Sequence, residues 1–169
     1  MTGAHRDMDP TRGEGAVGWL SALRRYITFV AFANLIWEFA HMPLYTLWET
    51  GSAGEIIFAA VHCTGGDILI ALSAVMLSLF LFGDGAWPAE RRIPVFAGTV
   101  VFGLAYTIFS EWLNIEIREA WAYRELMPVI PILDAGLSPV LQWIIVPLAG
   151  FSLARALPTV RRKRGIVDA

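Results

Sequence analysis

Four long apolar stretches constrain the fold of this chain more than any other feature. Each is about 20 residues long, the length that an α-helix needs to cross the hydrocarbon core of a bilayer. Backbone polar groups in lipid must be hydrogen-bonded within their own segment, so runs this long and uniformly apolar favour helices over a β-barrel. The sequence therefore predicts an all-α integral membrane protein, a four-helix transmembrane bundle. Its predicted spans are about residues 23–42, 57–82, 93–115 and 137–157.

The composition and the flanking segments agree with this prediction. The chain is 56% hydrophobic and 17% charged, whereas soluble domains are about a quarter charged. Residues 1–18 are polar and predict a disordered cytoplasmic N-terminus, without the apolar core of a signal peptide. Residues 19–157 form the predicted four-span domain, and residues 158–169 a basic cytoplasmic tail. The single cysteine, Cys63, excludes an internal disulfide.

The distribution of positive charge predicts the orientation of the bundle. Eleven of the thirteen Lys and Arg residues lie before the first span, between the second and third, or at and after the end of the fourth. The exceptions are Arg118 and Arg124. The positive-inside rule then places both termini in the cytoplasm and the loops at about 43–56 and 116–136 outside. On a membrane protein we read the basic tail as a solvated flank and expect no nucleic acid partner.

The end of the first span carries two ionisable residues, which are costly in a membrane and typical of functional sites. Glu38 and His41 are three residues apart, and this spacing puts both side chains on one face of a helix. Asn34 and Tyr45 extend the same stripe. Pro43 lacks a backbone N–H, so we expect the helix to end or kink just past His41.

Polar residues in the other three spans fall at a similar depth. At 1.5 Å per residue, Glu38, His62, Glu111 and Gln142 each lie roughly 5–10 Å from the outer membrane edge. A Gly65-Gly66 pair in the second span permits a bend or the close approach of a neighbour or ligand. The sequence thus predicts one inward-facing polar cluster. Its core members are Glu38, His41, His62, Asp67 and Glu111, and its supporting members are Asn34, Asn114, Arg118 and Gln142.

A metal site is the first chemical interpretation of this cluster. Glu-x-x-His on one helix, with carboxylates or histidines from others, is used by helical-bundle metal proteins. The predicted ligands are Glu38, His41, His62, Asp67 and Glu111. Such ligands suit Zn, Fe or Mn, and Cys63 or Met42 would shift the preference toward Cu. A second Glu-x-x-His, typical of di-metal bundles, is missing from the sequence.

Other interpretations remain open at this stage. His41 and His62 are candidate axial ligands of a haem. Alternatively, Glu38 and Glu111 are candidate catalytic groups of a metal-free acid–base enzyme that acts on a lipid or isoprenoid substrate, with Trp37 and Trp112 beside a cationic intermediate. The same polar pairs also suit plain helix packing, or a non-catalytic partner subunit of a membrane complex. Beyond membrane lipids, the expected partners are a second copy of the chain or another membrane subunit.

Several motifs resemble those of a family of small bacterial inner-membrane proteins with four predicted spans. The resemblance covers about residues 26–150. It implies a location in the bacterial inner membrane and implies no activity. The motifs are Glu38-Phe39-x-His41-Met42-Pro43-Leu44-Tyr45, His62-Cys63-Thr64-x-Gly66-Asp67, Glu111-Trp112-Leu113-Asn114, Trp121-Ala122-Tyr123 with Met127-Pro128, and Gly136-Leu137-x-Pro139 with Gln142-Trp143.

Overall fold

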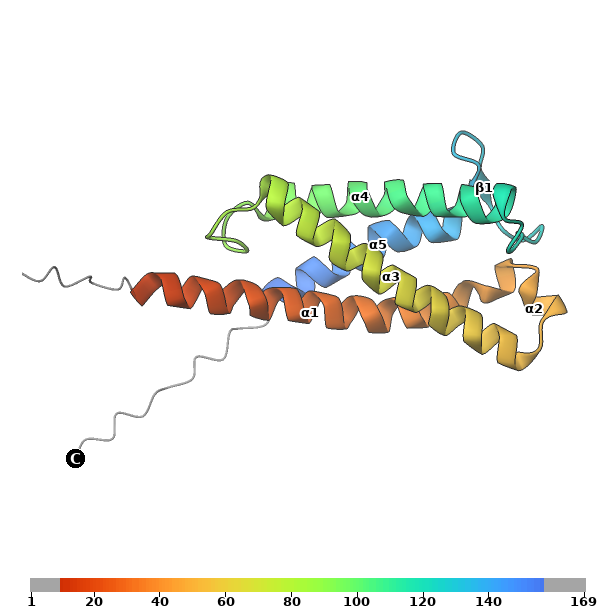
Figure 1. Ribbon diagram of the computed structural model, residues 1–169, viewed down its shortest axis with the longest axis horizontal. Coiled ribbons are helices and arrows are strands. Elements are labelled where there is room, and N and C mark those ends of the chain that lie inside the picture. The colour runs from red at the N-terminus through yellow and green to blue at the C-terminus, as the bar shows by residue number, and fades with distance from the viewer. Residues whose placement is uncertain (1–9, 157–169) are drawn as a thin grey trace, which may run out of the picture.

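Four long antiparallel helices make up most of the protein. The structure is a computed structural model and describes residues 10–156; residues 1–9 and 157–169, which include the predicted basic tail, lie outside the described part. The helices run alternately up and down, so both ends of the described chain lie at one end of the bundle, here called the terminal end (Figure 1). They are α1 (Pro10–His41), α3 (Ala53–Phe82), α4 (Arg92–Trp112) and α5 (Leu137–Ala156).

Short elements close the opposite end of the bundle, here called the α2 end. After α1 come a 3-10 turn (Met42–Leu44) and the single-turn helix α2 (Leu47–Thr50). A π-helical turn (Leu113–Ile117) ends the third span, and a small antiparallel hairpin of β1 (Val129–Ile130) and β2 (Ala135–Gly136) leads into α5. An isolated bridge between Tyr45 and Tyr123 joins the two loop regions. In Figure 1 these elements all lie at the right-hand end of the bundle, with α2 below and the hairpin above.

Each long helix packs against two others. α1 contacts α3 and α5, and α4 contacts the same two helices, so α1 and α4 lie across the bundle from each other. Glycine permits the closest approaches. A Cβ atom on Gly103 of α4 would overlap the indole ring of Trp143 on α5, and one on Gly98 would meet Ser78 and Phe82 of α3. These small residues bring the helices together, as is common in membrane bundles.

The surface of the bundle is apolar, as expected of helices that face lipid. Four helical segments are long and apolar enough to cross a membrane: Gly18–Leu44, Ala53–Phe82, Arg92–Ile117 and Leu137–Ala154. Large side chains such as Phe32, Ile36, Phe80 and Ile93 are each at least 66% exposed. Exposed apolar surface on this scale marks a membrane-embedded protein. The predicted four-helix membrane bundle is therefore confirmed.

Local sequence signals explain where the helices begin and end. α1 stops at His41 because Pro43 follows, as predicted. α3 begins with a capping box in which the hydroxyl of Ser52 accepts from the backbone N–H of Glu55, while the carboxylate of Glu55 accepts from the N–H of Ser52. α1 begins at Pro10, earlier than the sequence predicts. The third span ends with the π-helical turn at Ile117, and the chain then leaves the helix.

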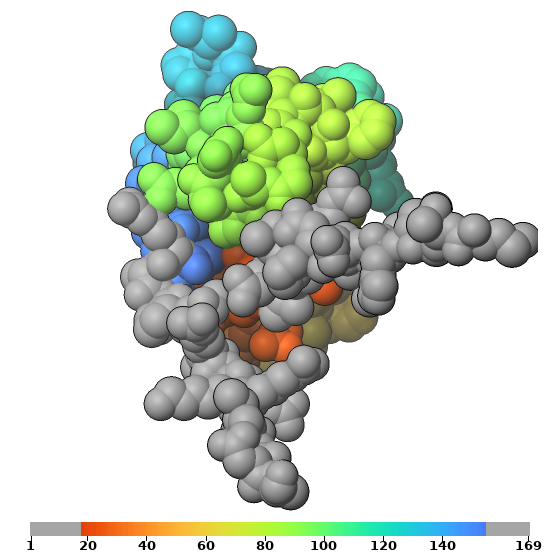
Figure 2. Space-filling view, turned by 90° about the vertical axis from the view of Figure 1, so that its left-hand side faces the viewer, coloured from red at the N-terminus to blue at the C-terminus, as the bar shows by residue number. Residues whose placement is uncertain are grey.

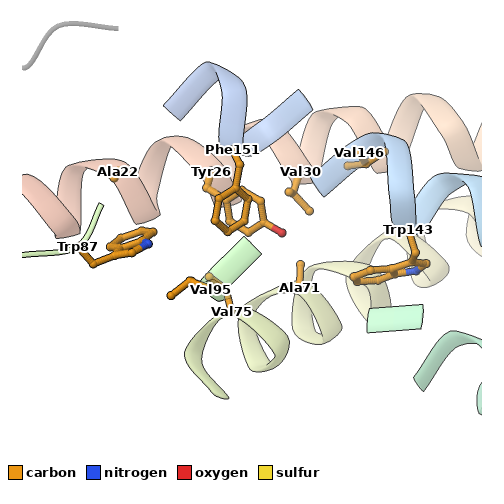
Figure 3. Packing of buried hydrophobic residues seen from close by; sticks show 10 residues of the cluster. All are labelled: Ala22, Tyr26, Val30, Ala71, Val75, Trp87, Val95, Trp143, Val146 and Phe151. Carbon is orange, nitrogen blue, oxygen red and sulfur yellow. The ribbon is translucent and has the colours of Figure 1, made fainter. Parts of the chain in front are cut away.

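Most of the apolar core lies toward the terminal end of the bundle. Seen from that end, the connection between α3 and α4 (green) lies above the visible part of α1 (red) (Figure 2). Trp87 of this connection is buried beside Ala22 (Figure 3). The rings of Tyr26 and Phe151 pack edge to face, with their centroids 4.7 Å apart. The core therefore holds the helices together at one end and leaves the α2 end free for polar side chains. Its buried members are Ala22, Tyr26, Val30, Ala71, Val75, Trp87, Val95, Trp143, Val146 and Phe151.

Candidate functional site

A cavity of about 340 Å³ lies in the half of the bundle toward the α2 end. All four long helices and the loops of the α2 end contribute to its wall. Three carboxyl groups line it, one each from α1, α3 and α4: Glu38, Asp67 and Glu111. Glu38 and Glu111 are buried and Asp67 is partly buried. The structure thus brings acidic residues from separate spans together around this cavity, as the sequence predicts.

Glu38 and His41 form a buried pair whose orientation is fixed from α5. The Nε2 atom of His41 lies 3.1 Å from Oε2 of Glu38, one turn earlier on α1. The other ring nitrogen, Nδ1, lies 3.1 Å from the hydroxyl of Ser138, which also accepts a hydrogen bond from the indole of Trp37. Both nitrogens of the imidazole are therefore engaged, which holds the ring in one plane.

A glutamine amide from α5 joins the carboxyl groups of α1 and α3. The Nε2 atom of Gln142 lies 3.0 Å from Asp67, 3.1 Å from Glu38 and 3.2 Å from the side-chain oxygen of Asn34. An amide nitrogen carries only two hydrogens, so it cannot fully serve three acceptors. The carboxyl groups of Glu38 and Asp67 therefore meet at one amide nitrogen. A proton on either carboxyl would relieve the repulsion between two like charges held this close together.

Charge balance favours a proton on this pair. Three ionised carboxylates, one imidazolium and the guanidinium of Arg118 at the cavity wall would leave one net negative charge, and uncompensated charge is costly in a membrane-embedded cavity. One proton bound by Glu38 and Asp67 together would balance this charge.

Two tyrosines hold the third carboxyl. Tyr123 donates a hydrogen bond to Oε2 of Glu111 and accepts one from the backbone N–H of Gly136 at 2.8 Å. Tyr45 reaches the same oxygen of Glu111 at 3.5 Å. Burial, with the charge of Glu111 as a smaller cause, raises the pKa of both Tyr45 and Tyr123 above the ordinary value. The phenols therefore stay neutral donors to a carboxylate.

A link between two loops covers the α2 end of the cavity. Arg124 donates to the backbone carbonyl of Pro43 at 2.7 Å and forms an ion pair with Glu49. The backbone adds bonds from Arg124 to Leu44 and from Thr46 to Ala122. These contacts tie the segment after α1 to the segment after the π-helical turn, and so close the cavity at this end.

The cavity wall reaches the lipid-facing surface of the bundle. Leu69 of α3 and Tyr106 of α4 both line the cavity, although their side chains are 66% and 52% exposed. Both residues lie well inside segments that are long enough to span a membrane. In Figure 1, α3 runs obliquely to α4 and diverges from it toward the α2 end. Through Leu69 and Tyr106 the cavity wall thus reaches the outer surface of the bundle.

The other predicted site residues lie at different distances from the carboxyl groups. Asn34 and Gln142 belong to the central network described above. Asn114 is buried, but it bonds to Ser110 and accepts from Arg118 at 3.5 Å, so Arg118 pairs with an amide at the cavity wall. His62 lies at the cavity edge, where its exposed ring stacks on Phe58 at 5.5 Å. It is therefore outside the network that joins Glu38, His41 and Asp67.

The geometry does not favour the metal interpretation. Within residues 18–154, whose side chains are described, no group of three or more His, Cys, Asp or Glu residues is placed to hold a metal ion. The haem hypothesis stays a prediction. In this arrangement both nitrogens of His41 already have partners and His62 faces outward on α3. The described residues instead form hydrogen-bonded pairs of acids and neutral donors.

Several residues of the site were not among the predicted members. Tyr123 and Ser138 contact Glu111 and His41 directly, and Tyr45 was noted only as part of a stripe on the first span. The pattern Trp121-Ala122-Tyr123 was visible in the sequence but lacked a predicted role. The indoles that line the cavity are Trp121 and Trp143, whereas Trp112 is 47% exposed and Trp37 is bonded to Ser138. Trp37 and Trp112 are not among the residues that line the cavity, and their role beside a substrate stays a prediction.

Comparison of the chain with protein-family models, with curated proteins and with solved structures finds no match. The resemblance of its motifs to small bacterial membrane proteins therefore stays a prediction.

Proposed function

We propose that this protein is a membrane-embedded acid–base catalyst that moves protons on an uncharged, lipid-soluble substrate. The observation that carries the proposal is the pair of carboxyl groups, Glu38 and Asp67, that meet at the amide nitrogen of Gln142 in the wall of a cavity reaching the outer surface of the bundle. A shared proton between two acids supplies a donor and an acceptor at one place. A structural role in helix packing would not require an adjoining cavity.

The residues around the cavity divide into an acid, a base and positioning groups. The protonated member of the Glu38–Asp67 pair would donate its proton to one carbon of a substrate double bond. Glu111, held by Tyr45 and Tyr123, would remove a proton from the allylic carbon that adjoins the other carbon of the double bond. One proton enters the substrate and one leaves, so the double bond shifts and no co-reactant is needed. His41 positions Glu38, and its own orientation is set by Ser138.

Such a reaction exchanges substrate hydrogen with solvent, and this provides the test. The purified protein is reconstituted with a total bacterial lipid extract in D₂O, and deuterium in each lipid species is measured by mass spectrometry. We expect at least one species to acquire deuterium with the wild-type protein. Asp67→Asn should slow this incorporation by about 10²-fold or more, because general acid–base groups contribute at least that factor.

Asp84→Asn is the matched control. Asp84 is an exposed carboxyl in the connection between α3 and α4, where it pairs with Arg91 at 3.7 Å. This variant should exchange deuterium at the wild-type rate. Equal incorporation with folded Asp67→Asn and wild-type protein, or none with the wild type across the full lipid extract, would contradict the proposed catalysis.

We also infer that the α2 end faces the periplasm of a bacterial inner membrane. The excess of Lys and Arg at the opposite end, together with the positive-inside rule, supports this orientation. The motif resemblance supports the bacterial inner membrane as the location.

A further inference from the structure

One threonine in the cavity lacks the hydrogen bond that its neighbours make. The buried hydroxyls of Thr64 and Thr99 donate to the carbonyl four residues earlier, at 2.7 and 2.8 Å. Thr107 is just as buried, at 7% exposure, and lies on the same helix as Thr99. Its hydroxyl nevertheless has no partner among the described residues, and its side chain lines the cavity. A buried hydroxyl without a partner costs about 1–3 kcal/mol, so a ligand that satisfies it is favoured.

A second unpartnered polar atom lies in the same wall. The indole nitrogen of Trp121 is buried and has no acceptor in the described part of the chain. An indole N–H can only donate, so its partner must carry a lone pair. Thr107 comes from the middle of α4 and Trp121 from the loop beyond it. The cavity therefore offers two hydrogen-bond donors in addition to its carboxyl groups.

The charge of the cavity restricts what these donors bind. An anion would lie against the acceptor oxygens of Glu38, Asp67 and Glu111, which is unfavourable. An ammonium group would suit the acids but has no lone pair for Trp121. The wall that reaches the outer surface of the bundle at Leu69 and Tyr106 favours an apolar molecule. The remaining class is an uncharged oxygen, such as that of an alcohol, ketone or ester, on an apolar chain.

We infer that Thr107 and Trp121 form an oxygen-binding subsite for such a lipid-soluble molecule. The inference rests on the proposed function, since it names the class of substrate for the same cavity. Glu111 lies one turn from Thr107 on the same face of α4, so an oxygen at Thr107 would hold the adjacent carbon atoms near a carboxyl group. Thr107 and Trp121 are positioning residues in this arrangement.

The test measures binding of defined probes by the shift of the melting temperature in detergent. The probes are 2-dodecanone, dodecane and dodecylammonium chloride. We expect 2-dodecanone to bind more tightly than the other two. Thr107→Val and Trp121→Phe should each weaken its binding about five-fold, since each removes one hydrogen bond. Thr99→Val is the matched control, because Thr99 is a buried threonine of α4 outside the cavity wall, and it should leave binding unchanged.

The outcomes separate this subsite from its alternatives. Equal binding of dodecane and 2-dodecanone, or binding of the ketone that neither variant weakens, would overturn the inference. So would tighter binding of dodecylammonium, which would make the cavity a cation site. Thr107→Val should fold as well as the wild type, because removing an unsatisfied buried hydroxyl should not lower the melting temperature. Weaker ketone binding by this variant therefore cannot be ascribed to unfolding.

Two further measurements identify the source of the oxygen and separate the two proposals. Binding of 2-dodecanone is first compared in bilayers of ester-linked phosphatidylglycerol and of its ether-linked analogue. Weaker binding in the ester-linked bilayers means that a phospholipid ester competes for the subsite. Equal binding in both means that the natural ligand is a free molecule. Ketone binding that depends on Thr107, without deuterium exchange in any lipid, would keep the subsite and refute the catalysis. Exchange that survives Thr107→Val with unweakened ketone binding would refute the subsite alone.

Discussion

Tyr123 shows how a single side chain outside the spans organises the carboxyl groups within them. Its hydroxyl donates to Glu111 and accepts from the backbone of Gly136, so it connects α4 to the start of α5. Its ring also lies 5.5 Å from that of Tyr45, the second donor to Glu111. One phenol thus positions a candidate base and anchors the β-hairpin.

Tyr123→Phe should destabilise the protein by about 1–3 kcal/mol, because it leaves a backbone N–H and a buried carboxyl short of a partner. Denaturation in detergent measures the loss. Tyr106→Phe is the control, since the hydroxyl of Tyr106 forms none of the hydrogen bonds of the described residues and its ring is half exposed. Equal destabilisation by both variants would contradict the role assigned to Tyr123.

The same residue predicts a dependence on alkaline pH. The pKa of Tyr123 is raised in the folded protein above the model-peptide value of 10.0, so above that pH the unfolded chain loses the proton more readily than the folded one. Stability is therefore retained below about pH 10 and falls as the pH rises further. Tyr123→Phe should make this fall shallower than in the wild type.

Among the elements, α3 is distinctive because a glycine pair leaves open space beside it. A Cβ atom on either Gly65 or Gly66 would meet nothing within 4 Å, so neither residue serves a close helix contact. Gly66 lines the cavity, whereas Gly65 is exposed on the outer surface. The sequence predicted a bend or a close approach at this pair. The helix continues through it, and Gly66 leaves room for the cavity.

Gly66→Leu should fill part of the cavity and lower binding of 2-dodecanone by about ten-fold or more, while Gly65→Leu, its control one residue away, leaves binding intact. Melting temperatures of both variants should match or exceed the wild type, because glycine within a helix costs about 1 kcal/mol relative to better helix formers. Thermal shift with the ketone measures both properties. Equal ketone binding by the two variants would place the ligand outside this cavity.

At the scale of the whole molecule, the two ends of the bundle carry different chemistry. The terminal end is packed with apolar residues such as Tyr26, Trp87 and Phe151, while the α2 end holds the carboxyl groups and the loops that cover them. Apolar packing and the carboxyl cluster are thereby separated along the bundle axis, so the core keeps the helices together while the α2 end accommodates a cavity.

The proposed orientation of the bundle is testable with single cysteines in a Cys63→Ala background. Ala120, in the loops of the α2 end, and Ala86, between α3 and α4, are both exposed. A membrane-impermeant maleimide should label Ala120→Cys in intact bacterial cells, and Ala86→Cys only after permeabilisation. The reverse pattern would invert the orientation, and labelling of both sites in intact cells would contradict an odd number of crossings between them.

The sequence by itself determined the membrane class, the four helices and the residues that end α1. Length and hydropathy decide these properties locally, because a bilayer imposes the same requirement on every span, and Pro43 acts on its own helix. The one-turn spacing of Glu38 and His41 likewise places them on one face before any packing is known.

Only the tertiary structure decided what those residues contact. Rotation of α3 turns Asp67 toward Glu38 and leaves His62 at the surface, and a helix with apolar residues all round gives no periodicity from which that rotation could be read. Tyr123 and Ser138 reach the site through loops whose path depends on long-range contacts. Only the folded protein shows that Thr107 lacks a hydrogen bond, because Thr64 and Thr99, which are also threonines within helices, bond to a carbonyl of their own helix.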